Sequence, residues 1–426
     1  MAIQCVRMQR LAQALALALG ASAAHADTVV SNCADDASAG TLRSVLAAAS
    51  NGDVIDVSAC SIITLTQGEL PIAASVTLHG PSSGTTTLDA AGTGRVLHST
   101  SVASGNDNLT ISHLTIQGGR SYAAASAPGG CILSGNLTMQ DSVVRDCIVG
   151  AAGASTGGGA VRADKVYLLT SRVEDSAAYA AGSGAFAVGG GVAADSLFHC
   201  VNSTISGNRA LSSQAGEGGG VEVNAGSLYM RGCTVSDNIA QYTAGVLQFG
   251  ATPSDTAFIV NSTVSGNHAT VEDGAIFTGS PLTLSSSTVA FNSATYYCGG
   301  VRSYQEIVMM SSIIANNSAP SADCVDFFTT MPAGGTDNLI SVMASNMPVG
   351  TIIADPKLTP LADHGGPTAT HGLSLSSPAV DTGNAPTGIF TDQRDVGFSR
   401  VSGGAADIGA YERQFGDDEI FYGGFR

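Results

Sequence analysis

The sequence predicts an all-β chain folded as a parallel β-helix, a solenoid in which short strands stack rung upon rung. Three features support this: an eleven-residue phrase repeats, its apolar positions form columns, and glycine-rich stretches separate the copies. One copy is FHCVNSTISGN, Phe198 to Asn208, and copies return about once every 25 to 32 residues. Repetition at this spacing indicates one supersecondary unit stacked many times.

Two positions of the phrase are apolar in every copy. The third is filled, in chain order, by Ile111, Met139, Leu168, Cys200, Met230, Ile259, Leu284 and Met309. The eighth is filled by Ile116, Val144, Val173, Ile205, Val235, Val264, Val289 and Ile314. Such columns fit stacked pleated strands, whose side chains alternate between two faces, and they do not fit a helical period of 3.6.

The last position of the phrase is polar in five successive copies, which end in Asn208, Asn238, Asn267, Asn292 and Asn317. Stacked asparagines can bond amide to amide along the stack, so we expect a ladder. Glycine-rich stretches such as 189–192 and 218–221 indicate tight bends that lead into a second short strand. Strand, corner, strand and turn without an intervening helix predict a parallel β-helix.

The composition agrees with a narrow stacked core. The 426 residues include 53 glycines and no tryptophan, and only 5% are aromatic and 12% charged. Frequent glycine and serine could also indicate disorder, but a hydrophobic content of 44% arranged in regular columns argues against it.

Residues 1–26 have the features of a secretory signal peptide. Arg7 and Arg10 precede a short apolar run, and Ala24-His25-Ala26 is an A-x-A cleavage site. No later run approaches the roughly 18 apolar residues that span a bilayer. We therefore expect an exported mature chain, at the cell surface or outside the cell, with no transmembrane segment.

The charge of the chain bears on its partners. The formal net charge is −17, and removal of Arg7 and Arg10 with the signal peptide makes it −19, which disfavours nucleic acid and anionic lipid. A divalent cation would suit an acidic chain, but the sequence has no EF-hand-like loop, no calcium-binding nonapeptide array and no histidines at metal-ligand spacing. We expect no metal, no cofactor and no nucleic-acid partner, and a polysaccharide or a surface protein as the ligand to consider.

Eight cysteines remain after Cys5 leaves with the signal peptide, and an even number in an exported chain predicts disulfides. Sequence spacing suggests three pairs that each lie within about one coil: Cys33 with Cys60, Cys131 with Cys147, and Cys298 with Cys324. Cys200 and Cys233 remain as a fourth pair. They occupy different columns of adjacent rungs, so two buried reduced thiols are the alternative.

Residues 27–60 are expected to cap the solenoid. Thr41 can cap a short helix whose Leu42, Val45 and Leu46 face one way, and an amphipathic helix suits the exposed apolar end of a stack. We expect the rest of the chain to divide into β-helix coils over 61–350, a C-terminal region over 351–412 and a tail over 413–426.

Two stretches resemble a family of exported bacterial proteins. CADDASAGTLRSVLAAASNGDVIDVS, from Cys33, resembles the N-terminal signature of CSLREA-type and polymorphic outer-membrane-protein-like repeat proteins. DPKLTPLADHGGPTATHGLSLSSPAVDTGN and TDQRDVGFSRVSGGAADIGAYE resemble the choice-of-anchor Q region of the same proteins. The resemblance implies a right-handed parallel β-helix, exported from a Gram-negative bacterium, with a structural, adhesive or glycan- or partner-binding role. It implies no shared catalytic residues, so none are assigned.

Polysaccharide lyase or glycoside hydrolase activity is the alternative function, since parallel β-helices also host such enzymes, although that is an analogy of fold. A polygalacturonase-like order of motifs is missing, because the aspartate pair at 35–36 precedes the coils, the histidine-glycine at 364–365 follows them, and no Arg-x-Lys occurs. Glu217 and Glu222 on neighbouring rungs could supply paired carboxylates. No catalytic constellation emerges from the sequence.

One column of the phrase is expected to face solvent. Its second position holds Tyr167, His199, Tyr229 and Phe258 in four consecutive copies. Exposed apolar columns often mark contact surfaces, and aromatic rings suit sugar rings, so these four residues are the candidate binding surface. The alternative is that a loop or the C-terminal segment around Leu361 to Leu375 packs over this face.

Overall fold

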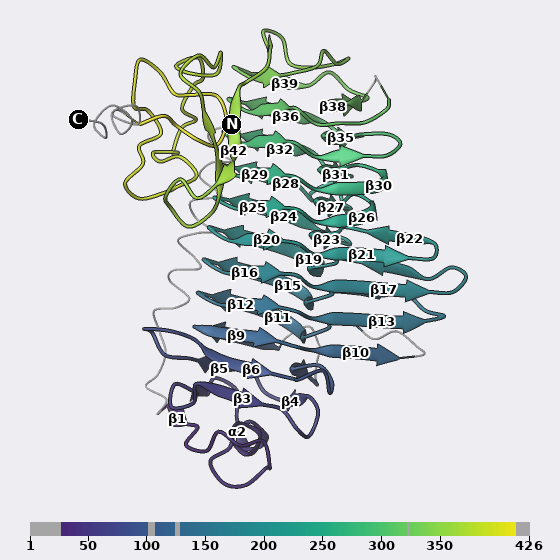
Figure 1. Cartoon of the computed structure of the whole chain (residues 1–426), viewed down its shortest axis with the longest axis vertical. Coiled ribbons are helices and arrows are strands. Elements are labelled where there is room, and N and C mark those ends of the chain that lie inside the picture. Colours follow the sequence, from purple (N-terminus) through teal and green to yellow (C-terminus); the bar gives the residue numbers. More distant parts are fainter. Residues whose placement is uncertain (1–26, 101–106, 124–127, 322–323, 415–426) are drawn as a thin grey trace, which may run out of the picture.

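The computed structural model describes residues 27–100, 107–123, 128–321 and 324–414, so the expected signal peptide and most of the expected tail lie outside the described residues. Across these residues the chain is nearly all β, with one short helix, α2 (Leu42–Ala48), at the N-terminal end (Figure 1). Three parallel sheets wrap around a common core. This is the predicted parallel β-helix.

Within the described residues the strands form three long sheets and one short pair. The first sheet contains β1 (Thr28–Val29), β2 (Val54–Asp56), β4 (Leu70–Ile72), β5 (Val76–His79), β7 (Leu97–Ser99), β8 (Asn108–Ser112), β11 (Ile132–Gln140), β15 (Val161–Leu169), β19 (Val192–Val201), β23 (Val221–Val223), β24 (Ser227–Arg231), β27 (Val246–Gln248), β28 (Ala257–Val260), β31 (Ile276–Thr278), β32 (Leu282–Ser285), β35 (Val301–Ser303), β36 (Ile307–Met310), β38 (Phe327–Thr329) and β39 (Gly334–Thr336). The second contains β3 (Ile62–Thr64), β6 (Thr86–Asp89), β9 (Leu114–Gln117), β12 (Val143–Arg145), β16 (Arg172–Glu174), β20 (Thr204–Ser206), β25 (Thr234–Ser236), β29 (Thr263–Ser265), β33 (Thr288–Ala290), β37 (Ile313–Ala315), β40 (Leu339–Ile340) and β41 (Ile352–Ile353). The third contains β10 (Arg120–Ala123), β13 (Ile148–Ala152), β14 (Thr156–Gly157), β17 (Ala177–Ala181), β18 (Phe186–Val188), β21 (Arg209–Ser212), β22 (Ala215–Glu217), β26 (Ile239–Tyr242), β30 (His268–Glu272) and β34 (Ser293–Ala294). The antiparallel pair is β42 (Leu358–Ala362) and β43 (Thr370–Leu373).

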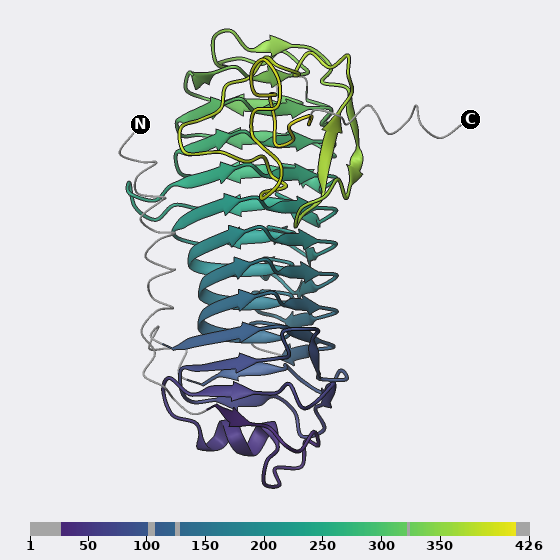
Figure 2. The same ribbon diagram turned by 90° about the vertical axis from the view of Figure 1, so that its left-hand side faces the viewer.

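One rung can be followed from β20 to β25. The chain leaves β20 through a corner, runs along β21 and β22 of the third sheet, bends at glycines 218–220, and returns along β23 and β24 of the first sheet. Neighbouring rungs pair in parallel and in register, with Thr204 opposite Thr234 and Val221 opposite Val246. Figure 2 shows the rungs stacked one above another. Equivalent side chains therefore line up in columns along the stack.

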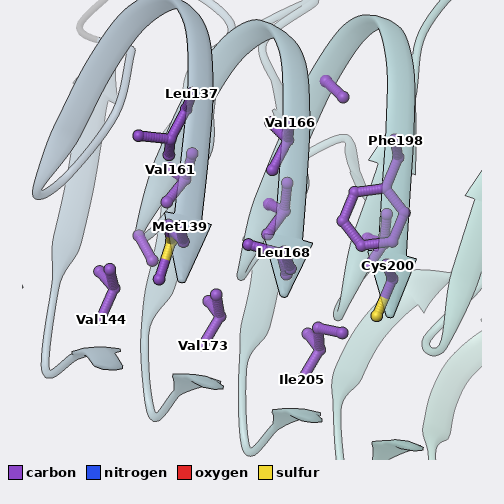
Figure 3. Packing of buried hydrophobic residues seen from close by; sticks show 14 of the residues in the cluster. Leu137, Met139, Val144, Val161, Val166, Leu168, Val173, Phe198, Cys200 and Ile205 are labelled. Carbon is purple, nitrogen blue, oxygen red and sulfur yellow. The ribbon is translucent and has the colours of Figure 1, made fainter. Parts of the chain in front are cut away.

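The core consists of such columns turned inward. Figure 3 shows two of them, Leu137, Val166 and Phe198 in one and Val144, Val173 and Ile205 in the other. All six side chains are fully buried. Burial of one such side chain stabilises the fold by about 1.5–3 kcal/mol, so the repeated columns supply the main driving force for folding.

The repeated phrase bends at its fifth residue and is not one continuous strand. That residue adopts a left-handed conformation in every copy, for example Asn202 at φ 49° and Asn261 at φ 45°. The strand before it belongs to the first sheet and the strand after it to the second. The bend explains why the third and eighth positions both face the core, because an odd spacing within one strand would place them on opposite faces.

The asparagine ladder is confirmed, in the order Asn208, Asn238, Asn267, Asn292 and Asn317. From Asn238 onward, each Oδ1 accepts hydrogen bonds from the Nδ2 and the backbone N–H of the asparagine one rung before it, at 2.8–3.1 Å. The Asn208 Oδ1 accepts from the backbone N–H of Ser176. At the C-terminal end Asp326 takes the place of the next asparagine and accepts from Asn317. The buried corners are thus joined by side-chain bonds that run along the stack.

A second ladder follows the sixth position of the phrase, which is Leu114 in the first copy and a serine or Cys233 in the others. The Ser171 and Ser203 hydroxyls each accept from the backbone N–H one rung before them, at 3.2 and 2.9 Å. The Ser262, Ser287 and Ser312 hydroxyls do the same at 3.1–3.3 Å. These small residues therefore hold the corner between the first and second sheets.

The N-terminal helix and the disulfides are as predicted. Thr41 caps α2 by accepting from the backbone N–H of Ser44, and Leu42 and Leu46 are buried. All four predicted disulfides are formed: Cys33–Cys60, Cys131–Cys147, Cys200–Cys233 and Cys298–Cys324. The pairing of Cys200 with Cys233 excludes the alternative of two reduced thiols there.

The C-terminal region folds back against the second sheet, beside the upper rungs in Figures 1 and 2. Gln393 is one of the residues that attach it to the rungs. The Gln393 Oε1 accepts from Thr263 Oγ1 at 2.6 Å, and its Nε2 donates to Thr234 Oγ1 at 2.8 Å and to Thr368 Oγ1 at 3.0 Å. One buried amide therefore fastens the C-terminal region to two successive rungs.

Replacement of Asn238 tests the asparagine ladder. Asn238→Leu removes the oxygen that accepts from Asn208 Nδ2 and N–H and the Nδ2 that donates to Asn267 Oδ1, which should lower the free energy of unfolding by about 1–3 kcal/mol. Asn238→Ser should cost less, since a hydroxyl can bond in both directions. Urea denaturation followed by circular dichroism measures the change, with the exposed Asn224 replaced by alanine as the control. Equal effects of Asn238→Leu and Asn224→Ala would contradict a structural ladder.

Replacement of Gln393 tests the attachment of the C-terminal region. Gln393→Ala removes the acceptor of Thr263 and one partner of Thr234 in a buried contact and should lower the unfolding free energy by about 1–3 kcal/mol. Limited proteolysis should then cut first within residues 355–412, because that region loses polar contacts with two rungs. The exposed Gln214→Ala variant is the control, and identical cleavage patterns for the two variants would exclude the attachment.

Candidate functional site

The four residues of the candidate binding surface lie side by side on the first sheet. Tyr167, His199, Tyr229 and Phe258 are opposite one another on successive rungs. The distances between neighbouring ring centroids are 5.9, 6.2 and 5.5 Å. The sequence therefore identified a contiguous aromatic column, which we call the Tyr229 column.

The side chains of the Tyr229 column pack mainly against one another. All four side chains are only partly exposed. Tyr229 and Phe258 are nearly parallel, with 6° between their planes, so each turns one face to the other. Burial lowers the pKa of His199, and its Nδ1 is buried without a hydrogen-bond partner. Because sugars stack on ring faces, this column offers them little surface.

The C-terminal region does not form its hydrogen bonds with the column. Within the described residues it bonds to the corners that follow the column, where Thr368 Oγ1 donates to the Gly232 carbonyl at 2.9 Å. It also bonds to the second sheet, where Ser265 Oγ and His371 Nε2 are 2.8 Å apart. The stretch from Leu361 to Leu375 thus lies beside the candidate column, on the neighbouring sheet.

The two glutamates considered for catalysis do lie in one cluster. Glu222, opposite Ala193 on the first sheet, is only 4% exposed, and one of its carboxylate oxygens, Oε2, has no hydrogen-bond partner. Burial raises the pKa of Glu222 to about 8, the charge of Arg162 opposes the rise, and the charges of Glu217 and Asp195 add to it. Arg162 itself forms an ion pair with Asp195.

A second cluster, absent from the sequence-based candidates, is centred on Arg302 of β35. Its guanidinium is paired with Asp273 and, at 3.2 Å, with Glu272. Its NH1 donates to the Tyr304 hydroxyl at 3.0 Å. Burial raises the pKa of Asp273 to about 6, although the charge and hydrogen bond of Arg302 oppose the rise. Arg302 is therefore held from three directions.

Aromatic rings surround this arginine. Its guanidinium carbon lies 4.9, 5.3 and 5.5 Å from the ring centroids of Phe277, Tyr297 and Tyr304. Phe249 contacts Phe277, and Phe328 contacts both Tyr304 and Tyr297. We call this group the Arg302 patch: Phe249, Glu272, Asp273, Phe277, Tyr297, Arg302, Tyr304 and Phe328.

The Arg302 patch reaches solvent. Tyr304 is 48% exposed and Phe249 is 37% exposed, and Tyr296 beside the patch is 68% exposed. The sequence does contain a pattern that could have indicated the Arg302 patch. Phe277 and Arg302 each follow by two residues the bend that leads into their strand, and they lie opposite each other on successive rungs. This column lies on the short strand before the eleven-residue phrase, so the positions of the phrase do not include it.

Neither a metal-binding cluster nor a membrane-spanning helix is found among the described residues. Among the described residues, no group of three or more histidine, cysteine, aspartate or glutamate side chains is placed to hold a metal ion. None of the helices in the described ranges is long and apolar enough to cross a membrane.

The Glu222 carboxyl makes stability depend on pH. Its folded pKa of about 8 lies above its ordinary value of 4.5, so folding favours the protonated form. The stability it contributes is complete below about pH 4.5 and is lost as the pH rises to about 8. We expect the wild type to lose stability between pH 5 and 8 relative to Glu222→Gln, whose side chain cannot ionise.

Thermal denaturation at several pH values measures this difference. The exposed Glu306→Gln variant is the control for loss of a carboxylate, and it should follow the wild type. Parallel curves for the wild type and Glu222→Gln across this range would show that Glu222 has no raised pKa.

No known protein family matches the sequence, and no curated protein matches it. Among solved structures, the chain is similar to a pectate lyase described as Pel9A, with 13% identity, a TM-score of 0.47, and coverage of 92% of this chain and 98% of that chain.

Proposed function

We propose that this chain is an exported β-helix that binds a neutral polysaccharide outside the cell through the Arg302 patch. The main support for the proposal is Arg302, which is paired with two carboxylates and surrounded by three aromatic rings. One of these rings, Tyr304, is exposed.

The composition of the patch suits a sugar ring. A pyranose has flat C–H faces that pack on aromatic rings and hydroxyls that need both donors and acceptors. Tyr304 and Phe249 supply exposed aromatic surface, while Arg302 supplies donors and Glu272 supplies acceptors. Phe277, Arg302 and Phe328 are opposite one another on successive rungs. With rungs about 4.8 Å apart, the patch is long enough for several sugar units.

The charges favour a neutral polymer over an acidic one. The patch contains one arginine and two carboxylates, so it has no excess positive charge for a polyuronate. The chain as a whole has a net charge of −17, which repels polyanions at long range. A neutral glycan needs no excess positive charge in the patch and is not repelled by the net charge of the chain.

The polar groups of the patch are also preorganised. Arg302 is held by Asp273, Glu272 and the Tyr304 hydroxyl, so binding does not have to order a mobile side chain. Loss of rotamer freedom costs roughly 0.5–1.5 kcal/mol for each immobilised side chain. A fixed arginine therefore favours binding of a weakly interacting, uncharged ligand.

Several features support an extracellular location. Four disulfides are stable outside the cytosol, and residues 1–26 have the composition of a signal peptide. The resemblance of the two chain ends to exported bacterial repeat proteins points the same way. We infer a secreted or surface-attached protein, and a surface protein remains the other class of partner for the same patch.

Glycoside hydrolysis or lyase chemistry is the second candidate, favoured by the Glu222 cluster. A protonated Glu222 near Asp195, which is ion-paired with Arg162, resembles the acid and carboxylate of glycoside hydrolysis. We rank it second because Glu222 is only 4% exposed, whereas a general acid must touch the substrate. Release of reducing ends or unsaturated products from neutral or uronate glycans, with or without calcium, would reverse this order.

Replacement of Tyr304 tests the proposal. Tyr304→Ala removes exposed aromatic surface and should weaken binding of a neutral polysaccharide about fivefold to tenfold, or about 1–1.4 kcal/mol, with little effect on Tm. Affinity electrophoresis against neutral and uronate polysaccharides identifies the ligand, and calorimetry measures the affinity. Phe390→Ala, which removes a ring that is 78% exposed in the C-terminal region, is the control. Retardation of the wild type by uronate polymers alone, or equal affinities of the two variants, would contradict the proposal.

A further inference from the structure

A buried histidine joins the antiparallel pair β42–β43 to the outer face of the second sheet. The Nε2 of His371, in β43, is 2.8 Å from Ser265 Oγ of β29, and its Nδ1 is 2.7 Å from the Thr359 carbonyl oxygen of β42. Its ring also packs on that of Phe291, with 5.1 Å between the centroids. His371 is only 3% exposed. One imidazole therefore links both strands of the pair, which we call the β42–β43 hairpin, to a rung.

The bonding partners of His371 select the uncharged imidazole. A carbonyl oxygen can only accept, so Nδ1 carries a proton and donates it to the Thr359 carbonyl. Nε2 then accepts from the Ser265 hydroxyl. Both ring nitrogens are thus used in the neutral form. A second proton, on Nε2, would add a positive charge to a buried site without adding a partner.

The surroundings do not compensate such a charge. Among the described residues, neither ring nitrogen of His371 is bonded to a carboxylate. The charged and titratable groups on the elements around it are His364 and Asp363 after β42, Arg413 beside Leu373, and Asp237 at the corner beside Gly266. Burial lowers the pKa of His371, the backbone hydrogen bond opposes this, and the charge of His364 lowers the pKa further.

The other bonds from the hairpin to the rungs do not titrate. Thr234 Oγ1 donates to the Ala369 carbonyl at 2.7 Å, and Thr368 Oγ1 donates to the Gly232 carbonyl at 2.9 Å. Hydroxyls and backbone carbonyls stay neutral throughout the range in which histidine titrates. His364, the other histidine of the hairpin, bonds within the hairpin, to Thr370. The response of this attachment to pH therefore depends on His371.

We infer that His371 is a pH-sensitive latch, which holds the β42–β43 hairpin against the second sheet at neutral pH and releases it in mildly acidic surroundings. When the hairpin is attached, a protonated imidazole must be buried, whereas in the released hairpin it is hydrated. Acid therefore favours release. The released hairpin uncovers a face of the second sheet that carries the hydroxyls of Thr234 and Ser265. No residue of the latch belongs to the Arg302 patch, so the inference does not rest on the proposed function.

The direction of the effect separates His371 from the buried carboxyls. A base whose pKa is lowered by folding contributes stability that is complete above about pH 6.5 and is lost as the pH falls. Glu412, in the same C-terminal region, acts in the opposite direction, because burial raises its pKa to about 7 and its contribution is lost as the pH rises. Glu222 behaves like Glu412. Loosening of the hairpin in acid therefore cannot come from these two carboxyls.

Amide hydrogen exchange followed by mass spectrometry tests the latch. After correction for the pH dependence of intrinsic exchange, the protection of residues 358–373 should fall about tenfold between pH 7 and pH 5 in the wild type, while β25 and β29 remain protected. His371→Gln, whose side chain cannot ionise, should show no such fall. The exposed His268→Gln variant is the control for loss of a histidine and should follow the wild type.

Three results would overturn the latch. The first is equal protection of residues 358–373 at both pH values in the wild type, and the second is an equal fall in the wild type and His371→Gln. The third is a fall that disappears in His364→Gln and persists in His371→Gln, which would assign the response to the other histidine.

A measurement on the wild type decides the matter if His371→Gln leaves the hairpin unprotected at both pH values. Hydrogen exchange at the C2 position of the imidazole reports the titration of each histidine. The latch predicts a midpoint for His371 below the ordinary value of 6.5. A midpoint at or above that value would show that the attached hairpin accepts the proton, and would overturn the latch.

Discussion

The interaction on which the rest of the structure depends is the bonding of polar side chains from corner to corner along the stack. At one corner Asn208, Asn238 and Asn267 bond side chain to side chain, and at another the serine hydroxyls accept from the backbone one rung before them. Hydrophobic burial drives collapse but does not fix the register between rungs, because apolar contacts are non-directional. Buried amides do fix it, since a shifted rung would leave them without partners.

Fixed register also determines which side chains lie next to one another on the outer surface. When every rung stacks in the same register, one outward position of a short strand becomes a column along the molecule. The contents of a column then decide its role. Rings at every position pack on each other, as in the Tyr229 column. An arginine between rings, as at Arg302, gives a mixed polar and aromatic patch.

The sequence was sufficient for the features that depend on repetition and insufficient for those that depend on how the chain turns and packs within a repeat. Columns such as Val235 and Val264, the ladder through Asn238 and three of the four disulfides follow from spacing, whereas the pairing of Cys200 with Cys233 was left open. The bend at Asn202 does not follow from spacing, because no residue type marks it: its equivalents include His113, Thr170 and Ser286. The Arg302 patch joins residues from four successive turns, and its aromatic members occur in different parts of their repeats. The burial of Glu222 depends on packing that its own strand does not reveal.

Amide hydrogen exchange at the corners tests the central claim most directly. The backbone N–H groups of Asn208, Asn238, Asn267 and Asn292 each donate to the side chain of the next rung. The account predicts that these amides exchange as slowly as the core strand amides of Val235 and Val264, through global unfolding alone. Exchange at the corners that is orders of magnitude faster than in those strands would show that the ladder does not hold the rungs in register.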